Sequence, residues 1–351
     1  MSAHPAARYV SLALIYIIWG STYLAVRVIV GDEALTPLQL QLLRSIAATV
    51  LCVILVLARH LRTRAARRPL PAAPTLAPRT RARLALVAMG SGVLLWTLGN
   101  GLTTIAAKDT ASSFIVMSMG TIPLWTVAVD AVLTRRLPTR RIIVAVLVGF
   151  AGLVLVLVPG LTSGSIITPG RGGPIMVLLM VSALTWTLGT FAQERVGASF
   201  DIWELSAWQY LGATLTLAVP VLLAGAPLHL GAVRAVQWVA FAFLVLFGSL
   251  IGMAAYAVVL RSFSPPVAST FAYVNPLVGI LLGAVILHET IAVVSLAGLV
   301  VVLGAVAVIF TAPSHRQPGP DSVGVDGGGV DSIDGAADAA GDPVAVPTIR
   351  A

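Results

Sequence analysis

The sequence predicts an all-α membrane protein in which ten transmembrane helices form two five-helix repeats of opposite orientation. Three observations lead to this fold class. Of the 351 residues, 58% are hydrophobic and only 10% are charged, whereas soluble domains carry about a quarter charged residues. Apolar runs of membrane-spanning length follow one another along the chain. Segments of the first half also resemble segments of the second half.

Ten apolar runs approach the roughly 20 residues that a helix needs to cross a bilayer. Several connections between them are only a few residues long, as at 107–110 and 289–292, which is expected between antiparallel neighbours. The predicted spans are 9–30, 38–58, 84–106, 111–133, 142–159, 174–194, 203–224, 237–260, 267–288 and 293–311.

Basic residues predict how these spans are oriented. If the N-terminus lies inside, 17 of the 22 Lys and Arg residues fall on the inner side and three on the outer side, while Arg27 and Arg44 fall within spans. Cytoplasmic loops of membrane proteins carry such an excess of Lys and Arg. We therefore expect a multi-pass protein of the cell membrane with both termini in the cytoplasm. The net charge of +8 then reflects contact with anionic lipid, and we expect no nucleic acid as a partner.

The fourth and ninth spans provide the main sign of an internal repeat. Residues 109–136 align with residues 262–289 so that Pro123 matches Pro276 at an offset of 153 residues. Because each repeat holds five spans, an odd number, the second copy must insert upside down relative to the first. Inverted repeats of this kind are typical of secondary transporters, whose binding sites lie near the midplane between the repeats.

Other parts of the two halves correspond more weakly. WGSTYLAVR at 19–27 aligns with WTLGTFAQE at 186–194, and Arg44 aligns with Gln209. We expect a first repeat at 1–159, with a basic cytoplasmic loop at 59–83, and a second repeat at 160–312. Residues 313–351 are rich in Gly, Asp, Ala and Pro without an apolar period, which predicts a disordered cytoplasmic tail.

Three segments resemble the drug/metabolite transporter superfamily and, within it, the EamA family. They are WGSTYLAVR in the first span, LQLLRSIAAT in the second and AYVNPLVGILLGAVILHE in the ninth. The resemblance covers about residues 9–311 and implies one EamA repeat in each half. It also implies similarity to exporters of amino acids and other small metabolites that work by alternating access. These motifs do not specify a substrate.

Aromatic and polar side chains inside the spans are the candidates for a substrate path. Trp19 could form a cavity wall, and the Thr22 hydroxyl could bind substrate or bond back to its own helix. Arg44 lies about 9 Å inside the outer end of its span, where a charge is costly. It could bind a substrate carboxylate or the carbonyls of a partner helix, or extend to the outer headgroups.

Further candidates are neutral polar groups, which either line a cavity or link helices by hydrogen bonds. They are Asn100, Thr103, Ser118, Gln209, Tyr256, Tyr273 and Asn275. Pro123 and Pro276 are the predicted hinge positions because proline interrupts helical hydrogen bonding. Gly279 and Gly283 form a small-residue pair that permits close helix packing.

The sequence lacks the motifs of enzymes and pumps. The five histidines fall in loops, in tails or at a span edge, and Cys52 is the only cysteine. No HExxH, GxSxG or phosphate-binding GxxxxGK[ST] occurs, so we expect no enzyme, no catalytic residue, no metal and no cofactor. Asp130 could carry a coupling proton or pair with Arg135 and Arg136.

The sequence therefore favours a secondary transporter that exports small metabolites such as amino acids across the cytoplasmic membrane. One half would rock against the other around a central cavity lined by spans 1, 3, 4, 6, 8 and 9. A membrane scaffold or sensor, or a channel-like protein without carrier activity, is the alternative. The expected partners are a small-molecule substrate and membrane lipid, with the chain either a monomer or a homodimer.

Overall fold

The computed structural model describes residues 5–30, 35–65, 77–107, 109–110, 112–162, 170–286 and 292–312. All the elements in these ranges are helices, and nine stretches among them are long and apolar enough to cross a membrane. Helix α1 (Pro5–Val30), with 26 residues, corresponds to the remaining predicted span. The predicted tail at 313–351 and residues 66–76 of the predicted loop at 59–83 lie outside the described residues.

The first half contains five spans, two of which are built from several helical pieces. In order they are α1; α2 (Pro37–Ala65); α3 (Pro78–Gly92) with the π-helical η1 (Val93–Asn100) and α4 (Gly101–Ala106); α5 (Ser112–Met119) with α6 (Ile122–Thr134); and α7 (Arg140–Thr162).

The second half repeats this pattern piece by piece. Its spans are α8 (Gly172–Gly197); α9 (Ile202–Ala224), followed by the short 3₁₀ turn η2 (Leu230–Ala232); α10 (Ala235–Phe243) with the π-helical η3 (Leu244–Ile251) and α11 (Gly252–Ser262); α12 (Pro265–Ala268) with α13 (Phe271–Ile286); and α14 (Val293–Thr311). The third and eighth spans therefore each contain an eight-residue π-helical segment, and π-helical turns are frequent at functional sites. The fourth and ninth spans are each interrupted by a break in the helix.

The interruptions of the two spans do not coincide with the two matched prolines. The fourth span breaks at Gly120–Thr121, and Pro123 follows in the first turn of α6, where proline needs no backbone N–H. The ninth span breaks at Ser269–Thr270, whereas Pro276 lies inside α13. The two prolines are therefore not at equivalent points, although both spans are broken.

Side-chain hydroxyls stabilise the break in the ninth span. The Ser269 hydroxyl donates to the Pro266 carbonyl at 2.9 Å, and the Thr270 hydroxyl donates to the Val267 carbonyl at 2.6 Å. The Val267 carbonyl also accepts from the Thr270 N–H at 3.2 Å, so its hydroxyl bond is an additional one. Inside a membrane, a carbonyl that loses its helical partner needs a replacement donor. The break is therefore encoded by hydroxyl residues as well as by the preceding prolines.

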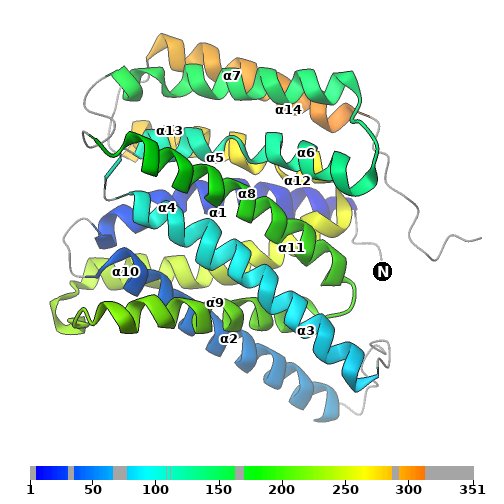
Figure 1. The fold of residues 1–351 in the computed structure, drawn as a ribbon, viewed down its shortest axis with the longest axis vertical. Coiled ribbons are helices and arrows are strands. Elements are labelled where there is room, and N and C mark those ends of the chain that lie inside the picture. The colour runs from blue at the N-terminus through cyan, green and yellow to red at the C-terminus, as the bar shows by residue number, and fades with distance from the viewer. Residues whose placement is uncertain are drawn as a thin grey trace, which may run out of the picture. The chain divides into compact units, whose positions relative to one another are not determined.

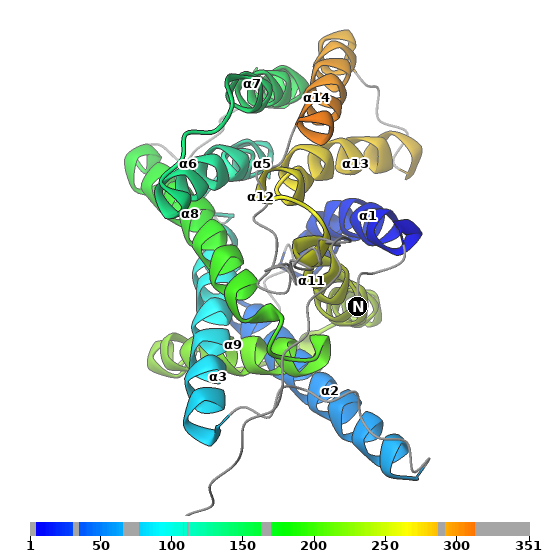
Figure 2. The same cartoon turned by 90° about the vertical axis from the view of Figure 1, so that its right-hand side faces the viewer.

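The two halves are interleaved. Helix α1 of the first half packs against α11 and α13 of the second, and α8 of the second half packs against η1, α3 and α6 of the first. Figure 2 shows α1 and α11 on one side and α8 and α3 on the other. Two symmetric pairs complete the arrangement: α2 with α9, and α7 with α14, which lie side by side in Figure 1.

Close packing of α1 against α13 depends more on Gly20 than on Gly279. A Cβ on Gly20 of α1 would lie 2.7 Å from the Cβ of Val278 on α13, so the two helices meet where a side chain is missing. A Cβ on Gly279 would have only the Gly20 carbonyl oxygen near it, at 3.8 Å. The surroundings of Gly283 lie outside the described residues.

Charged side chains gather at the ends of the spans. At the end predicted to be cytoplasmic, Arg59 pairs with Asp201, and Arg81 pairs with Glu204 at 2.6 Å. At the opposite end, Arg171 pairs with Asp109 at 2.9 Å. All three pairs are partly exposed, and such pairs add little stability, so they mainly position the helix ends.

Candidate functional site

Six aromatic side chains meet between six different spans. They are Trp19 of α1, Trp96 of η1, Trp186 of α8, Tyr210 of α9, Tyr256 of α11 and Phe271 of α13. All six are buried. We call this set the aromatic cluster. It fills the space where a central cavity was predicted, so the chain is closed at this level.

The aromatic cluster is built around Trp19. Its ring lies 5.5 Å from that of Trp186, 5.0 Å from that of Tyr256 and 5.1 Å from that of Phe271, measured between centroids. Its indole Nε1 donates to the Gly248 carbonyl of η3 at 3.1 Å. A Cβ on Gly252 would lie 2.5 Å from this nitrogen, so the glycine provides the space for the indole.

Arg44 of α2 is directed into the protein beside this cluster. Its side chain is 5% exposed, its Nε donates to the Ser249 hydroxyl at 2.8 Å, and its guanidinium carbon lies 4.9 Å from the centroid of the Trp96 ring. The predicted alternative, extension to the outer headgroups, does not match this position. In the described part of the chain no carboxylate lies within 4.0 Å of it.

The neighbours of Arg44 are themselves held in place. The Tyr210 hydroxyl donates to the Ser249 carbonyl at 3.0 Å, and the Ser249 hydroxyl reaches the Leu244 carbonyl at 3.1 Å. That last bond links residues five apart, the spacing of the π-helix. The π-helical turn of η3 thus presents Ser249 to Arg44, while η1 presents Trp96.

Gln209, the counterpart of Arg44 in the second half, is completely buried. Its Nε2 donates to the Ser91 hydroxyl at 2.9 Å and to Oε1 of Gln193 at 3.1 Å. Its own Oε1 has no hydrogen-bond partner among the described residues. The repeat therefore places a cation at one site and a neutral amide at the other.

Tyr256 and Asn275 link different spans. The Tyr256 hydroxyl shares a hydrogen bond of 2.8 Å with Thr190 of α8. With its amide nitrogen turned toward its acceptors, Asn275 donates to the Tyr16 carbonyl of α1 at 3.3 Å and to the Phe271 carbonyl at 3.0 Å. Asn275 therefore joins α13 to α1 next to the aromatic cluster.

Three predicted hydroxyl residues use their protons within their own helices. Thr22 donates to the Trp19 carbonyl at 2.7 Å, Thr103 to the Asn100 carbonyl at 2.7 Å, and Ser118 to the Phe114 carbonyl at 2.8 Å. Asn100 itself lies half-buried at the end of η1. These bonds match the alternative in which hydroxyls satisfy their own helix.

Tyr273 lies apart from the other candidates. Its ring is completely buried, and its hydroxyl donates to the Val146 carbonyl of α7 at 2.7 Å. It belongs to a second apolar core formed with α7 and α14. The structure therefore does not bring Tyr273 together with the aromatic cluster.

Several residues of the site were not predicted from the sequence. Trp96, Tyr210, Ser249 and Phe271 lie in ordinary apolar runs, and Trp186 was noted only as the counterpart of Trp19. The one available signal was the pair of glycines, Gly248 and Gly252, on either side of Ser249. Gly248 leaves space for Arg44, and Gly252 leaves space for Trp19. This glycine pair therefore indicates the position of the site and not only close helix packing.

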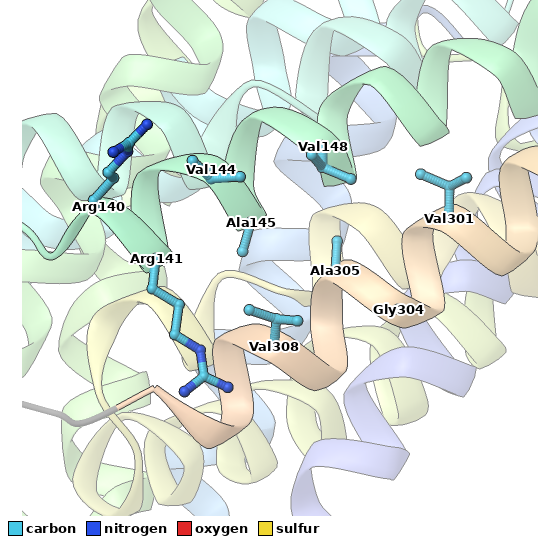
Figure 3. A pocket seen from close by; sticks show the side chains of 9 residues that line it. All are labelled: Arg140, Arg141, Val144, Ala145, Val148, Val301, Gly304, Ala305 and Val308. Carbon is cyan, nitrogen blue, oxygen red and sulfur yellow. The ribbon is translucent and has the colours of Figure 1, made fainter.

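A large groove lies away from this site, between α7 and α14. It has a volume of about 580 Å³ and is lined by Arg140, Arg141, Val144, Ala145, Val148, Val301, Gly304, Ala305 and Val308. Figure 3 shows the two arginines at one end and the valines along the groove. Arg141 donates to the Thr311 hydroxyl at 2.8 Å. An apolar groove with basic groups at one end suits a lipid better than a small polar substrate.

Titratable groups in the described ranges do not gather into a metal site, since no three His, Cys, Asp or Glu side chains come together there. Asp130 of α6 is half-buried. Among the described residues no basic side chain lies within 4.0 Å of it, so the predicted pair with Arg135 or Arg136 is not formed.

Comparison with known proteins matches both halves of the chain. The model of the EamA-like transporter family fits residues 8–158 and again residues 173–311. The chain is 30% identical over 304 residues to "Uncharacterized inner membrane transporter YedA" of Escherichia coli (strain K12), covering 85% of this chain and 89% of that protein. It is 24% identical over 179 residues to "Uncharacterized transporter YvbV" of Bacillus subtilis (strain 168), covering 48% of this chain and 53% of that protein. A solved crystal structure with 17% identity matches with a TM-score of 0.66 over 87% of this chain and 96% of the other, which supports the fold alone.

Proposed function

The chain belongs to the EamA-like transporter family, and we propose that it is a secondary transporter that exports small metabolites such as amino acids by alternating access. The observation that carries this proposal is the interleaved inverted repeat closed by the aromatic cluster. Six spans converge on one buried point, and one of them, the ninth, is a broken helix. The fourth span, which contacts the ninth, is broken as well. Broken helices at a repeat interface are where secondary transporters bind their substrates.

The packing suggests which parts move. We name two sets of helices: the α1 group, made of α1, α10, η3, α11, α12 and α13, and the α8 group, made of α3, η1, α4, α5, α6 and α8. Within each group the first span of one half packs against the third and fourth spans of the other half. Rocking of one half against the other, as expected from the sequence, would break these contacts. Rocking of the α1 group against the α8 group preserves them.

The aromatic cluster supports this division because its ring contacts cross between the groups. Trp19 and Phe271 of the α1 group contact Trp186 of the α8 group, with centroids 5.5 Å and 6.0 Å apart. Edge-to-face ring contacts can separate without leaving a charge or a hydrogen-bonding group unpaired. They are therefore suited to a contact that opens and closes repeatedly.

We assign to Arg261 of α11 the contact that closes the space between the α1 group and the α8 group at the inner end of the spans. Its guanidinium donates to the Gly197 carbonyl and, at 3.1 Å, to the Phe200 carbonyl, at the C-terminal end of α8. A cation at a helix C-terminus is favoured because unpaired carbonyl groups carry partial negative charge there. This contact joins the two groups at the end that the basic residues predict to be cytoplasmic.

Amino acids are proposed as cargo because the site combines aromatic rings, neutral hydrogen-bonding groups and one cation. The cytoplasmic membrane as location, and both termini inside, are proposed from the excess of Arg at one end of the spans. Lipid in the groove between α7 and α14 is the proposed membrane partner. The oligomeric state of the purified protein in detergent tests whether the chain is a monomer or a homodimer.

Liposomes reconstituted with the purified protein test the function. The liposomes are loaded with a pool of unlabelled amino acids and supplied outside with each labelled amino acid in turn. A carrier gives saturable uptake that is accelerated by internal substrate, relative to empty liposomes. Uptake that neither saturates nor responds to internal substrate would indicate a channel, and no uptake of any compound would favour a scaffold.

A further inference from the structure

We propose that Arg44 binds the carboxylate of the transported molecule, which is a small compound with one free carboxylate and an apolar body. The inference rests on the proposed function and specifies what the site recognises. It begins from a buried charge that has no counter-charge within 4.0 Å among the described residues. Arg44 is the only buried Lys or Arg among the described residues, and its side chain is 5% exposed.

The described acidic side chains do not neutralise Arg44. Asp109, Asp201 and Glu204 pair with arginines at the ends of the spans. Asp130 lies on α6, a helix that contributes no residue to the aromatic cluster, and Glu194 is exposed on α8. An unpaired buried charge is strongly unfavourable, and an arginine so deep in the protein cannot reach headgroups. A ligand that brings an anionic group would remove this penalty.

Hydrogen-bond donors near Arg44 also lack acceptors. Its Nε donates to Ser249, but no described group accepts from its two terminal nitrogens. The Nε1 of Trp96, whose ring lies under the guanidinium, is buried with no hydrogen-bond partner in the described part of the chain. Donors without acceptors, beside an arginine fork, are the complement of a carboxylate.

The number of charges and the surrounding rings restrict the ligand further. One cation suits a monocarboxylate, whereas a phosphate ester would call for several basic groups. The aromatic cluster begins directly beside Arg44 with Trp96 and continues to Trp186 at 6.1 Å between centroids. When the α1 group and the α8 group move apart, contacts between their aromatic rings are lost. An apolar or aromatic part of the ligand, attached to the carboxylate, would replace those contacts.

The position of Arg44 also connects binding to motion. Ser249 belongs to η3 of the α1 group, and Trp96 belongs to η1 of the α8 group. Arg44 of α2 therefore touches both groups at once. A carboxylate that draws the guanidinium away from Ser249 or Trp96 changes a contact between the groups.

The test uses thermal unfolding of the purified full-length protein, because this reports binding without transport. The probes are L-phenylalanine and 3-phenylpropionate, each compared with its carboxamide. We expect both carboxylates to raise the unfolding temperature of the wild type and the carboxamides to leave it unchanged. Arg44→Gln should weaken carboxylate binding at least tenfold without lowering the unfolding temperature of the free protein.

Ser249→Asp gives a second arm that does not depend on removing the arginine. The new carboxylate would lie beside Arg44 Nε and act as an internal ligand. We expect it to raise the unfolding temperature by roughly 3 °C or more and to abolish the response to both carboxylates. Ser249→Asn, of the same size and neutral, is the control and should keep the response.

Two results would overturn the assignment. One is carboxylate affinity within twofold of wild type in Arg44→Gln. The other is a wild type that responds to neither carboxylate together with a Ser249→Asp variant that is no more stable. Liposome flux separates this from the proposed function. Carriage of carboxamides but not carboxylates leaves the carrier in place and removes the Arg44 assignment. Carboxylate binding without flux of any compound would keep the Arg44 assignment and remove the proposed carrier function.

Discussion

Trp19 and Trp186 occupy corresponding positions in the two halves and contact each other edge to face, with centroids 5.5 Å apart and planes at 88°. Two tryptophans that only a weak sequence similarity had matched are thus in direct contact. The two rings belong to the α1 group and the α8 group. Their contact must be lost or rearranged whenever those groups separate.

A double-mutant cycle on this pair tests the contact. Trp19→Phe and Trp186→Phe should each lower stability, and the double variant should lose less than the two single losses together. The expected coupling is about 0.5–1.5 kcal/mol, the range for aromatic pairs. Unfolding of the purified protein by denaturant measures it. Trp238→Phe is the control, because Trp238 is 41% exposed and contacts only Phe241 among the described rings.

Gly252 and Gly279 provide a matched comparison of two glycines in spans. Gly252→Ala would place a Cβ 2.5 Å from Trp19 Nε1, whereas at Gly279 the nearest atom would be 3.8 Å away. We expect Gly252→Ala to cost about 1–3 kcal/mol through overpacking and to reduce transport. Gly279→Ala should leave both within experimental error. Equal losses at the two sites would show that the space around the Trp19 indole is not critical.

The sequence predicted the spans because hydropathy depends only on neighbouring residues, and it predicted the inverted repeat because the copies kept local similarity. It could not predict the site in the same way. Whether Arg44 turns outward or inward depends on Ser249 and Trp96, which are 205 and 52 residues away. The π-helical turns that present these two residues leave no distinct pattern in an apolar run.

The prolines illustrate the same limit. The alignment of Pro123 with Pro276 correctly indicated two broken spans, but the ninth span breaks at Ser269–Thr270. A proline lowers the cost of a break without fixing its position, since hydroxyl side chains and a partner helix decide which carbonyls can remain free of helical bonds. Tyr273 was predicted beside the path for its polarity, yet its hydroxyl satisfies a carbonyl of α7.

Asn275 and Tyr273, two positions apart on α13, separate a role in transport from a role in packing. Asn275→Ala removes the link to the Tyr16 carbonyl of α1, and Tyr273→Phe removes the link to the Val146 carbonyl of α7. Each should cost about 1 kcal/mol of stability. We expect only Asn275→Ala to reduce liposome flux severalfold. A similar loss of flux in both variants would return Tyr273 to the substrate path.

Arg261 allows the inner closure to be tested by chemical labelling. The reporter is a cysteine at Thr190, which is buried where α8 meets Tyr256 of α11, in a background with Cys52 replaced by Ala. Arg261→Ala removes the bonds to the Gly197 and Phe200 carbonyls that join the two groups. The reporter should then react severalfold faster with a membrane-impermeant maleimide.

The side from which labelling occurs matters as much as its rate. In inside-out vesicles the reagent reaches the cytoplasmic end, and we expect the acceleration there and not in right-side-out vesicles. Arg195→Ala is the matched control because Arg195 is an exposed arginine in the last turn of α8. It should leave the rate unchanged. If both variants label at the wild-type rate, Arg261 only orders the end of α8, and closure depends on the aromatic cluster alone. Acceleration confined to right-side-out vesicles would instead reverse the proposed orientation.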